Sequence, residues 1–264
     1  MTPTPHQLQP LTMPMPTVTT VLFDIDNTLI PTRAIWQQAL DAVAARLAGA
    51  HPGVSAAVIA SAYTSTSDRL WGDYHRTLAP LGSHTAARRH VWDTALREAG
   101  IALTARQLTD HVDDFAHRQM RAIRPVAATV EAFRRLAAVY QLGVVTNGDA
   151  DQQHAKLEQA GLDGYFETVV CALGNGRRKP HPAPFLRACQ DLAVRPEQCL
   201  YVGDEWSADI VGARAAGLHP VWITPTGQPP PGSAPTTRFT SLASCLAALR
   251  DHAAHRPIRE TEPT

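Results

Sequence analysis

Five short runs of mainly β-branched and other apolar residues constrain the fold more than any other feature of this sequence. They are Val18–Phe23, Leu142–Thr146, Phe166–Cys171, Cys199–Val202 and His219–Thr224. None alternates cleanly between apolar and polar residues, which is typical of strands that are covered on both faces. Helical patterns separate the later runs, at 150–160, 181–193 and 207–216. Strands that alternate with helices predict an α/β fold with a parallel sheet.

The segment between the first run and the second has a different character. It contains no convincing strand, and four helical patterns lie at 34–48, 54–64, 86–99 and 105–122. Glycine and proline residues separate these patterns, as expected for loops between helices. An all-helical insertion after the first strand predicts a second, smaller domain at 31–124. The α/β core is then expected to comprise 17–30 and 125–254.

The two ends of the sequence are predicted to be disordered tails, at 1–16 and 255–264. Residues 1–16 contain five prolines and no Lys or Arg, which does not fit a secretory signal. A proline-rich linker at 225–235 precedes one last predicted helix, at 241–255. No run of about 18 apolar residues is present, so we expect no membrane span and a cytoplasmic location.

Charge and cysteine content narrow the possible partners. Lys plus Arg equals Asp plus Glu, at 24 each, so no net field attracts nucleic acid or an acidic membrane. Any anion must therefore bind at a local site. The four cysteines show no CxxC spacing, which favours small buried side chains in a reducing compartment over zinc ligands or disulfides.

Two acids, Asp24 and Asp26, stand where the first run ends. The period of two along a strand places both carboxylates on one side. Ligands of open α/β sheets bind beyond the carboxyl ends of the strands, so these acids are expected where a substrate binds. Their mutual repulsion favours a divalent cation such as Mg²⁺, which prefers oxygen ligands. A solvated turn or a helix cap is the alternative interpretation.

Further acids follow the fourth run. Asp204 comes shortly after it, next to Gly203, and Asp209 lies about one helical turn later. Oxygens from Asp24, Asp26 and Asp204 could complete a site for a hard metal ion. Asp209 has an alternative role as an acid that interacts with the dipole at the start of a helix.

Two other segments could bind phosphate. Thr146 and Asn147 end the second run, where a hydroxyl and the backbone N–H groups of a turn could bind a phosphoryl oxygen. An ordinary Asn-Gly turn is the alternative. Lys179 lies at a strand-to-helix junction, where its ammonium offers a point charge to a phosphate and to a carboxylate. The adjacent Arg177 and Arg178 are interpreted as solvated basic residues.

In order and spacing, these segments resemble the four motifs of the haloacid dehalogenase superfamily. The matching residues are Asp24-x-Asp26-x-Thr28, then Thr146, then Lys179-Pro180, then Gly203-Asp204-x4-Asp209. The resemblance extends from about Val18 to Thr224. It implies a Rossmann-like core and identifies the helical insertion at 31–124 as a cap of the first type.

The resemblance also implies a role for each motif residue. Asp24 would be the nucleophile, and Asp26 would protonate the leaving oxygen and then activate water. Thr146 and Lys179 would bind the transferring phosphoryl group. Mg²⁺ would bind Asp24, the main-chain carbonyl of Asp26, and Asp204. Asp209 would stand next to the metal, either as a ligand or just behind the ligands.

Asp26 distinguishes branches of this superfamily. Dehalogenases of the superfamily lack an Asp two residues after the nucleophile, and transport ATPases have Thr there. Asp26 therefore favours a phosphatase or a phosphotransferase. The cap type and the segment Thr146-Asn147-Gly148-Asp149 resemble the branch that holds nucleotide, flavin mononucleotide and sugar phosphate phosphatases, which implies a phosphatase that hydrolyses a small phosphate ester of one of these types. Two alternatives remain open: a phosphomutase or other phosphotransferase, and a non-catalytic regulator that binds a phosphorylated ligand. We expect a monomer or homodimer that binds neither nucleic acid nor membranes.

Overall fold

The structure is a computed structural model that describes residues 18–173, 177–254 and 259. The chain divides into two compact units. One contains the residues up to 30 together with those from 125 onward, and we call it the core unit. The other contains residues 31–124, and we call it the helical unit. The tails predicted at 1–16 and, except for Arg259, at 255–264 lie outside the described residues.

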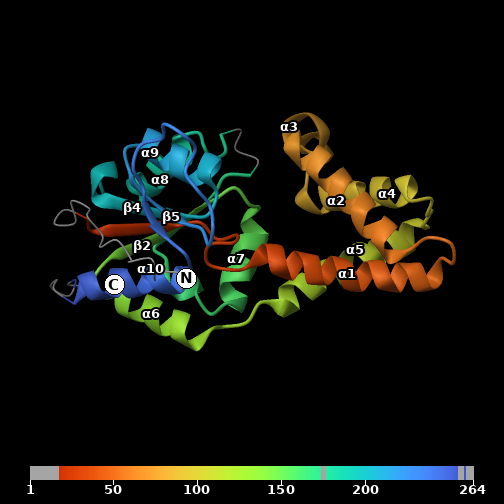
Figure 1. Cartoon of the computed structure of the whole chain (residues 1–264), viewed down its shortest axis with the longest axis horizontal. Helices are drawn as coiled ribbons and strands as arrows, with labels where there is room; N and C mark the ends of the chain where they lie inside the picture. The colour runs from red at the N-terminus through yellow and green to blue at the C-terminus, as the bar shows by residue number, and fades with distance from the viewer. Residues whose placement is uncertain (1–17, 174–176, 255–258, 260–264) are drawn as a thin grey trace, which may run out of the picture. The chain divides into compact units, whose positions relative to one another are not determined.

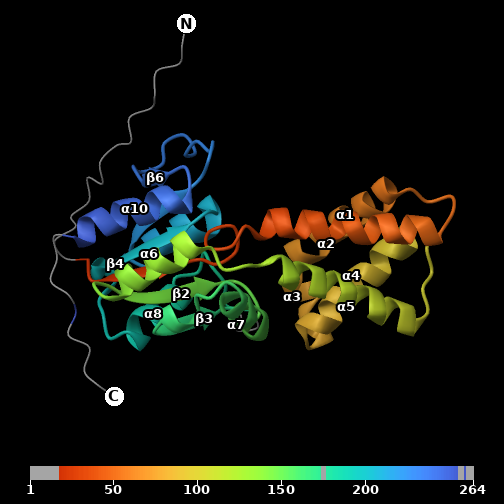
Figure 2. The ribbon, with the colours of Figure 1, turned by 90° about the horizontal axis from the view of Figure 1, so that it is seen from below.

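The core unit contains a parallel sheet, so the predicted α/β fold class is confirmed (Figures 1 and 2). Its strand order is β3-β2-β1-β4-β5-β6, and every neighbouring pair is parallel. The strands are β1 (Thr20–Phe23), β2 (Gln141–Thr146), β3 (Thr168–Cys171), β4 (Cys199–Gly203), β5 (His219–Ile223) and β6 (Thr237–Phe239). The predicted runs match β1 to β5, whereas the short β6 after the proline-rich segment was not predicted.

The central position of β1 determines where the polar strand ends meet. Phe23 pairs with Val144 of β2 on one side and with Val202 of β4 on the other. The backbone N–H of Asp24 continues this ladder by donating to the carbonyl of Val202 at 2.9 Å. Residues that follow β1, β2 and β4 therefore gather at one edge of the sheet, as expected for an open α/β fold.

Helices cover both faces of the sheet (Figure 1). On one face α6 (Ala127–Ala137) packs beside α10 (Leu242–Ala253), and α8 (Ala183–Asp191) and α9 (Val211–Ala215) lie on the other. Helix α7 (Ala150–Gln159) directly follows β2, and a π-helical turn at Trp206–Ile210 precedes α9. Short 3₁₀ turns lie at Asp163–Tyr165 and Pro196–Gln198. The π-helical turn and α6 were not predicted.

The helical unit has a hydrophobic core of its own. Its helices are α1 (Thr32–Ala50), α2 (Ala56–Gly72), α3 (Tyr74–Thr77), α4 (His84–Glu98) and α5 (Ala105–Ala122), with a 3₁₀ turn at Ala79–Leu81. Ser55, Ser83 and Thr104 cap the starts of α2, α4 and α5 with their side-chain oxygens. Buried side chains from these four long helices form one cluster that includes Val43, Tyr63, Trp92 and Phe115.

The four predicted helices of this unit are present, with α2 extending well beyond the predicted end at 64 because Thr66 and Leu70 are also buried. The short α3 was not predicted. Within the described ranges, no helix of the protein is both long enough and apolar enough to cross a membrane.

Candidate active site

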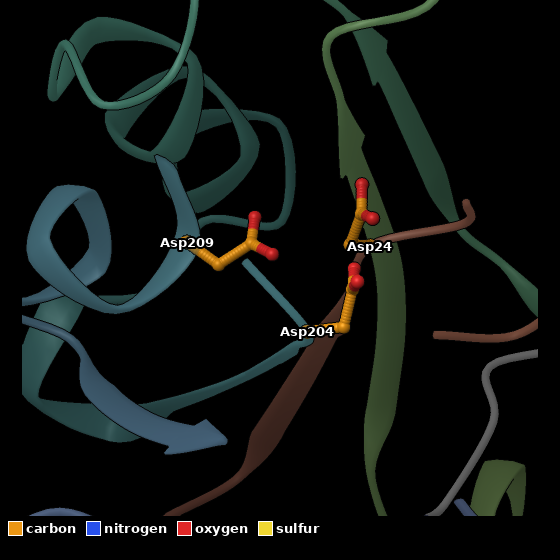
Figure 3. A group of neighbouring side chains, drawn as sticks. All are labelled: Asp24, Asp204 and Asp209. Carbon is orange, nitrogen blue, oxygen red and sulfur yellow. The ribbon is translucent and has the colours of Figure 1, made fainter. Parts of the chain in front are cut away.

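Three acids from separate segments converge at the edge of the sheet where β1 and β4 end (Figure 3). Asp24 follows β1, Asp204 follows β4, and Asp209 belongs to the π-helical turn. One carboxylate oxygen from each lies within 4.8 Å of the others. The structure thus brings together three of the four acids that the sequence suggested for a metal. The carboxylate of Asp26 is not part of this group.

The turn after β4 is built to hold Asp209 in this position. The backbone N–H of Glu205 donates to Asp209 Oδ2 at 2.9 Å. A Cβ on Gly203 would lie only 2.4 Å from the carboxyl group of Asp209, so glycine leaves the space that this side chain occupies. The indole N–H of Trp222 fixes the neighbouring segment by donating to the carbonyl of Asp204 at 2.8 Å.

Lys179 is buried among these groups. Its Nζ lies 2.7 Å from Asp24 Oδ1 and 2.7 Å from Asp209 Oδ1. It also donates to the hydroxyl of Tyr201 at 2.8 Å and to the carbonyl of Val145 at 3.0 Å. One ammonium group therefore joins two carboxylates that would otherwise repel each other.

Asn147 holds the backbone from which Lys179 projects. Its Oδ1 accepts from the N–H of Lys179 at 2.8 Å, and its Nδ2 donates to the carbonyl of the same residue at 3.0 Å. The amide of Asn147 thus joins the end of β2 to the segment that carries the lysine. Its predicted role in substrate binding stays a prediction.

Burial and neighbouring charges strongly shift the pKa values of Asp24 and Lys179 in this cluster. Burial raises the pKa of Asp24 to about 7, although Lys179 acts in the opposite direction and Asp209 and Asp26 add to the rise. Burial alone would lower the pKa of Lys179, but Asp24 and Asp209 outweigh it and hold that pKa above its usual value. Lys179 therefore stays protonated. Its single positive charge does not balance the negative charges of the carboxylates around it.

Asp26 has a different environment from Asp24. Gln153 Nε2 donates to Asp26 Oδ2 at 2.7 Å, and Lys156 Nζ donates to Asp26 Oδ1 at 2.5 Å. The same Gln153 nitrogen donates to Thr146 Oγ1 at 2.9 Å, and that oxygen also accepts from the backbone N–H of Gly148 at 3.2 Å. Asp26 and Thr146 are therefore connected through one side chain of α7.

Sequence analysis did not single out three residues that contact the expected site residues. Tyr201 lies inside the apolar run of β4, and Gln153 and Lys156 lie inside the helical pattern of α7. A signal for two of them was present. Gln153 and Lys156 are three positions apart in the short helix that follows Thr146-Asn147-Gly148, so they share one helical face beside a suspected phosphate-binding turn.

Comparison with protein families matches residues 18–217 to the haloacid dehalogenase-like hydrolases. This protein belongs to that family. The match includes all the motif residues discussed above and identifies the chain as an enzyme of the hydrolase class. The expected superfamily membership is thus confirmed.

Similar proteins come from several organisms. A glyceraldehyde 3-phosphate phosphatase of Methanopyrus kandleri is 29% identical over 77% of this chain and 82% of its own. A phosphoserine phosphatase of Thermus thermophilus is 34% identical over 70% of this chain and 74% of its own. Among solved structures, a 2-haloacid dehalogenase of Pseudomonas syringae is 27% identical, with a TM-score of 0.62 over 89% of this chain and 99% of its own.

Proposed function

We propose that this protein is a Mg²⁺-dependent phosphatase that hydrolyses a small-molecule phosphate monoester through a phosphoaspartate on Asp24. Family membership and the similarity to phosphatases make it an enzyme that acts on phosphate monoesters. The metal, the intermediate and the substrate class are our proposal. The observation that carries it is a buried carboxylate, Asp24, in contact with Lys179 and grouped with Asp204 and Asp209.

The donor groups of the site fit Mg²⁺. All three grouped side chains offer carboxylate oxygens, the ligand type that this ion prefers. When ionised, the four acids of the site carry two more charges than Lys156 and Lys179 balance. A divalent ion matches that difference, and when bound it would offset the repulsion between a phosphate and the Asp24 carboxylate.

We assign Asp24, Asp204 and the main-chain carbonyl of Asp26 as the metal ligands. Asp209 is better placed to hold neighbouring site residues than to bind the metal itself. Its Oδ1 already accepts from Lys179 and lies 3.2 Å from the Tyr201 hydroxyl, and its Oδ2 accepts from the backbone N–H of Glu205.

The reaction would proceed in two displacements at phosphorus. Asp24 forms a bond to phosphorus while the bond to the leaving oxygen breaks, and Asp26 gives that oxygen a proton. Water then attacks the phosphoaspartate, Asp26 takes a proton from it, and phosphate and the free carboxylate of Asp24 are released. Lys179 and the Thr146 hydroxyl bind the oxygens of the group that is transferred.

Dehalogenation is the activity of the structural relative from Pseudomonas syringae, and Asp26 argues against it here. A halide leaves without a proton, so a dehalogenase has no use for a donor at this position. In this protein both oxygens of Asp26 accept hydrogen bonds from side chains of α7, which orients a group that must exchange protons with the leaving oxygen and with water.

Several finer points belong to the same proposal and rest on the sequence. We propose a substrate of the nucleotide, flavin mononucleotide or sugar phosphate type, a cytoplasmic location, and a monomer or homodimer. We also propose that residues 31–124 act as the cap that selects the substrate, since an inserted helical unit is what the family resemblance implies for that role.

A panel of phosphorylated metabolites tests this function. Purified protein with Mg²⁺ is expected to release inorganic phosphate from at least one small ester and from p-nitrophenyl phosphate, and to stop when the metal is chelated. Conversion of a sugar phosphate to an isomer without phosphate release would instead indicate a phosphomutase. Binding of a metabolite without turnover would favour a regulator.

A further inference from the structure

Lysine is rare in this protein, and its positions are informative. Only two of the 24 basic residues Lys and Arg are lysines, Lys156 and Lys179. Each of them pairs with one acid of the Asp24-x-Asp26 motif. Lys179 contacts Asp24, and Lys156 contacts Asp26. The chain thus uses arginine at all its other Lys/Arg positions and lysine only next to these two acids.

The difference between the two cations explains this usage. An ammonium is a compact point charge that can donate to one oxygen from a confined position, whereas a planar guanidinium needs more room and favours two parallel contacts. The side chain of Lys156 is 19% exposed, so most of it is enclosed beside Asp26. A surface ion pair formed by chance would not require such a position.

Gln153 supplies the second contact from the same face of α7. It lies three residues before Lys156, so both side chains project toward Asp26, and each engages a different oxygen of its carboxylate. Gln153 is 1% exposed and also donates to the hydroxyl of Thr146. One buried amide therefore contacts both Asp26, the proposed proton donor, and Thr146, which is proposed to bind the phosphoryl group.

The surrounding backbone is shaped to hold this amide. A Cβ on Gly148 would lie 1.9 Å from Gln153 Nε2, so the turn after β2 admits the amide only because residue 148 is glycine. Gln153 Oε1 is buried without a hydrogen-bond partner among the described residues. The donor contacts to Asp26 and Thr146 thus determine the position of the side chain, and its acceptor oxygen is left without a partner among the described residues.

We propose that Gln153 and Lys156 are positioning residues that hold the Asp26 carboxylate in line with the leaving oxygen and at a fixed separation from Thr146. This inference rests on the proposed phosphatase function. Neither residue takes part in bond making. They restrict the rotation of the Asp26 side chain, so that the proton reaches the oxygen whose bond to phosphorus is breaking.

The dependence of rate on the leaving group separates this role from a structural one. An alkoxide is a poor leaving group that needs the proton, whereas p-nitrophenolate leaves readily without it. The ratio kcat/KM reports phosphorylation of Asp24 and excludes later steps. Loss of positioning should therefore reduce kcat/KM for an alkyl phosphate much more than for p-nitrophenyl phosphate.

The test uses Gln153→Leu and Lys156→Met in the full-length protein with Mg²⁺. Gln159→Leu, an identical change at an exposed position of the same helix, is the matched control. We expect kcat/KM for the best alkyl phosphate of the panel to fall on the order of 10²-fold in both variants. The fall with p-nitrophenyl phosphate should be less than about tenfold, and the control should match the wild type with both substrates.

Other results would overturn the inference in distinguishable ways. Equal losses on the two substrates would show a general disturbance of the site, and no loss on either would show that the contacts are irrelevant. In both cases the phosphatase assignment would survive. A wild-type protein that hydrolyses neither substrate would refute the proposed function and this inference together.

Discussion

Asp24 is the residue on which the proposed chemistry depends most directly. Replacing it by Asn removes the nucleophile but keeps the size of the side chain. We expect kcat for p-nitrophenyl phosphate to fall by about 10³-fold or more. The fold should survive, because one charge leaves a crowded site and Lys179 keeps its contact with Asp209.

Phosphate release and thermal unfolding of the Asp24→Asn variant are the measurements. Turnover near the wild-type rate would rule out Asp24 as the nucleophile. The wild-type protein freed of metal and reloaded with Mg²⁺ provides the control for the assay.

Tyr201 is the second residue that merits a test, since it was not foreseen. Its hydroxyl donates to the carbonyl of Val145 and contacts Lys179 and Asp209, while burial, followed by the charges of Asp209 and Asp24, holds its pKa well above the usual value. We expect Tyr201→Phe to lower the free energy of unfolding by about 1–2 kcal/mol and also to lower kcat, because Lys179 loses a contact.

Tyr140→Phe is the matched control. Tyr140 is equally buried, and its hydroxyl contacts His252, away from the acids. This variant should lose stability, as measured by chemical denaturation, and keep full activity. If Tyr201→Phe were as active as Tyr140→Phe, the hydroxyl would have no part in holding Lys179.

The turn after β4 shows how an element depends on one glycine. In Gly203→Ala the new methyl group would collide with the carboxyl group of Asp209, which we expect to lower both activity and stability by displacing that acid. Gly49→Ala is the contrast. Gly49 lies in α1, and the space that a Cβ would occupy there is open, so alanine should stabilise by about 0.5–1 kcal/mol without affecting turnover.

Chemical denaturation and steady-state kinetics of the two alanine variants check this prediction. Full activity in Gly203→Ala would mean that the position of Asp209 tolerates displacement.

Helix α5 carries a buried histidine that should make the helical unit sensitive to acid. Burial, reinforced by Arg46, lowers the pKa of His111 to about 4, with Asp114 acting in the opposite direction. Its Nε2 has no partner among the described residues, and its ring packs against Trp92 in a T-shaped arrangement. The folded unit therefore keeps this histidine neutral.

The direction of the pH effect on stability follows from the difference between the pKa of His111 in the folded and in the unfolded protein. The folded pKa lies below the unfolded value of 6.5, so His111 imposes no penalty above pH 6.5 and a growing one as the pH falls toward 4. The full penalty is about 3 kcal/mol. Denaturation at several pH values should show this loss, and His111→Phe should abolish it. An unchanged pH dependence in that variant would place the sensitivity elsewhere.

At the level of elements, the sequence indicated what depends on local pattern and missed what depends on packing. The strand ends bearing Asp24, Thr146 and Asp204 could be predicted, because the carboxyl ends of parallel strands share an edge. The contacts of Asp26 could not, because they depend on how α7 is rotated against the sheet. Strand β6 was missed because three residues after a proline-rich segment carry no periodicity.

Among the residues that the structure describes, the helical unit and the core unit each have a hydrophobic cluster of their own. One cluster lies entirely within the helical unit, and another packs β1, β2 and β4 against α8 and α9. Two cores in one chain predict two unfolding transitions in calorimetry. Mg²⁺ should raise only the transition of the core unit, which contains the acids, while mild acid should lower only that of the helical unit.

Calorimetry with and without Mg²⁺ tests this prediction, with chelator-treated protein as the reference. A single transition that responds as one to both treatments would show that the two units unfold cooperatively.

The insertion of 31–124 directly after β1 has a consequence for synthesis of the chain. The central strand of the sheet leaves the ribosome first, yet its neighbours β2 and β4 are encoded far downstream. Phe23 and Val144, which pair side by side, are separated by about 120 residues, or roughly 6 to 24 s of translation at about 5–20 residues per second. During that interval β1 is an apolar strand with both edges open, a condition that invites capture by chaperones or by a neighbouring nascent chain.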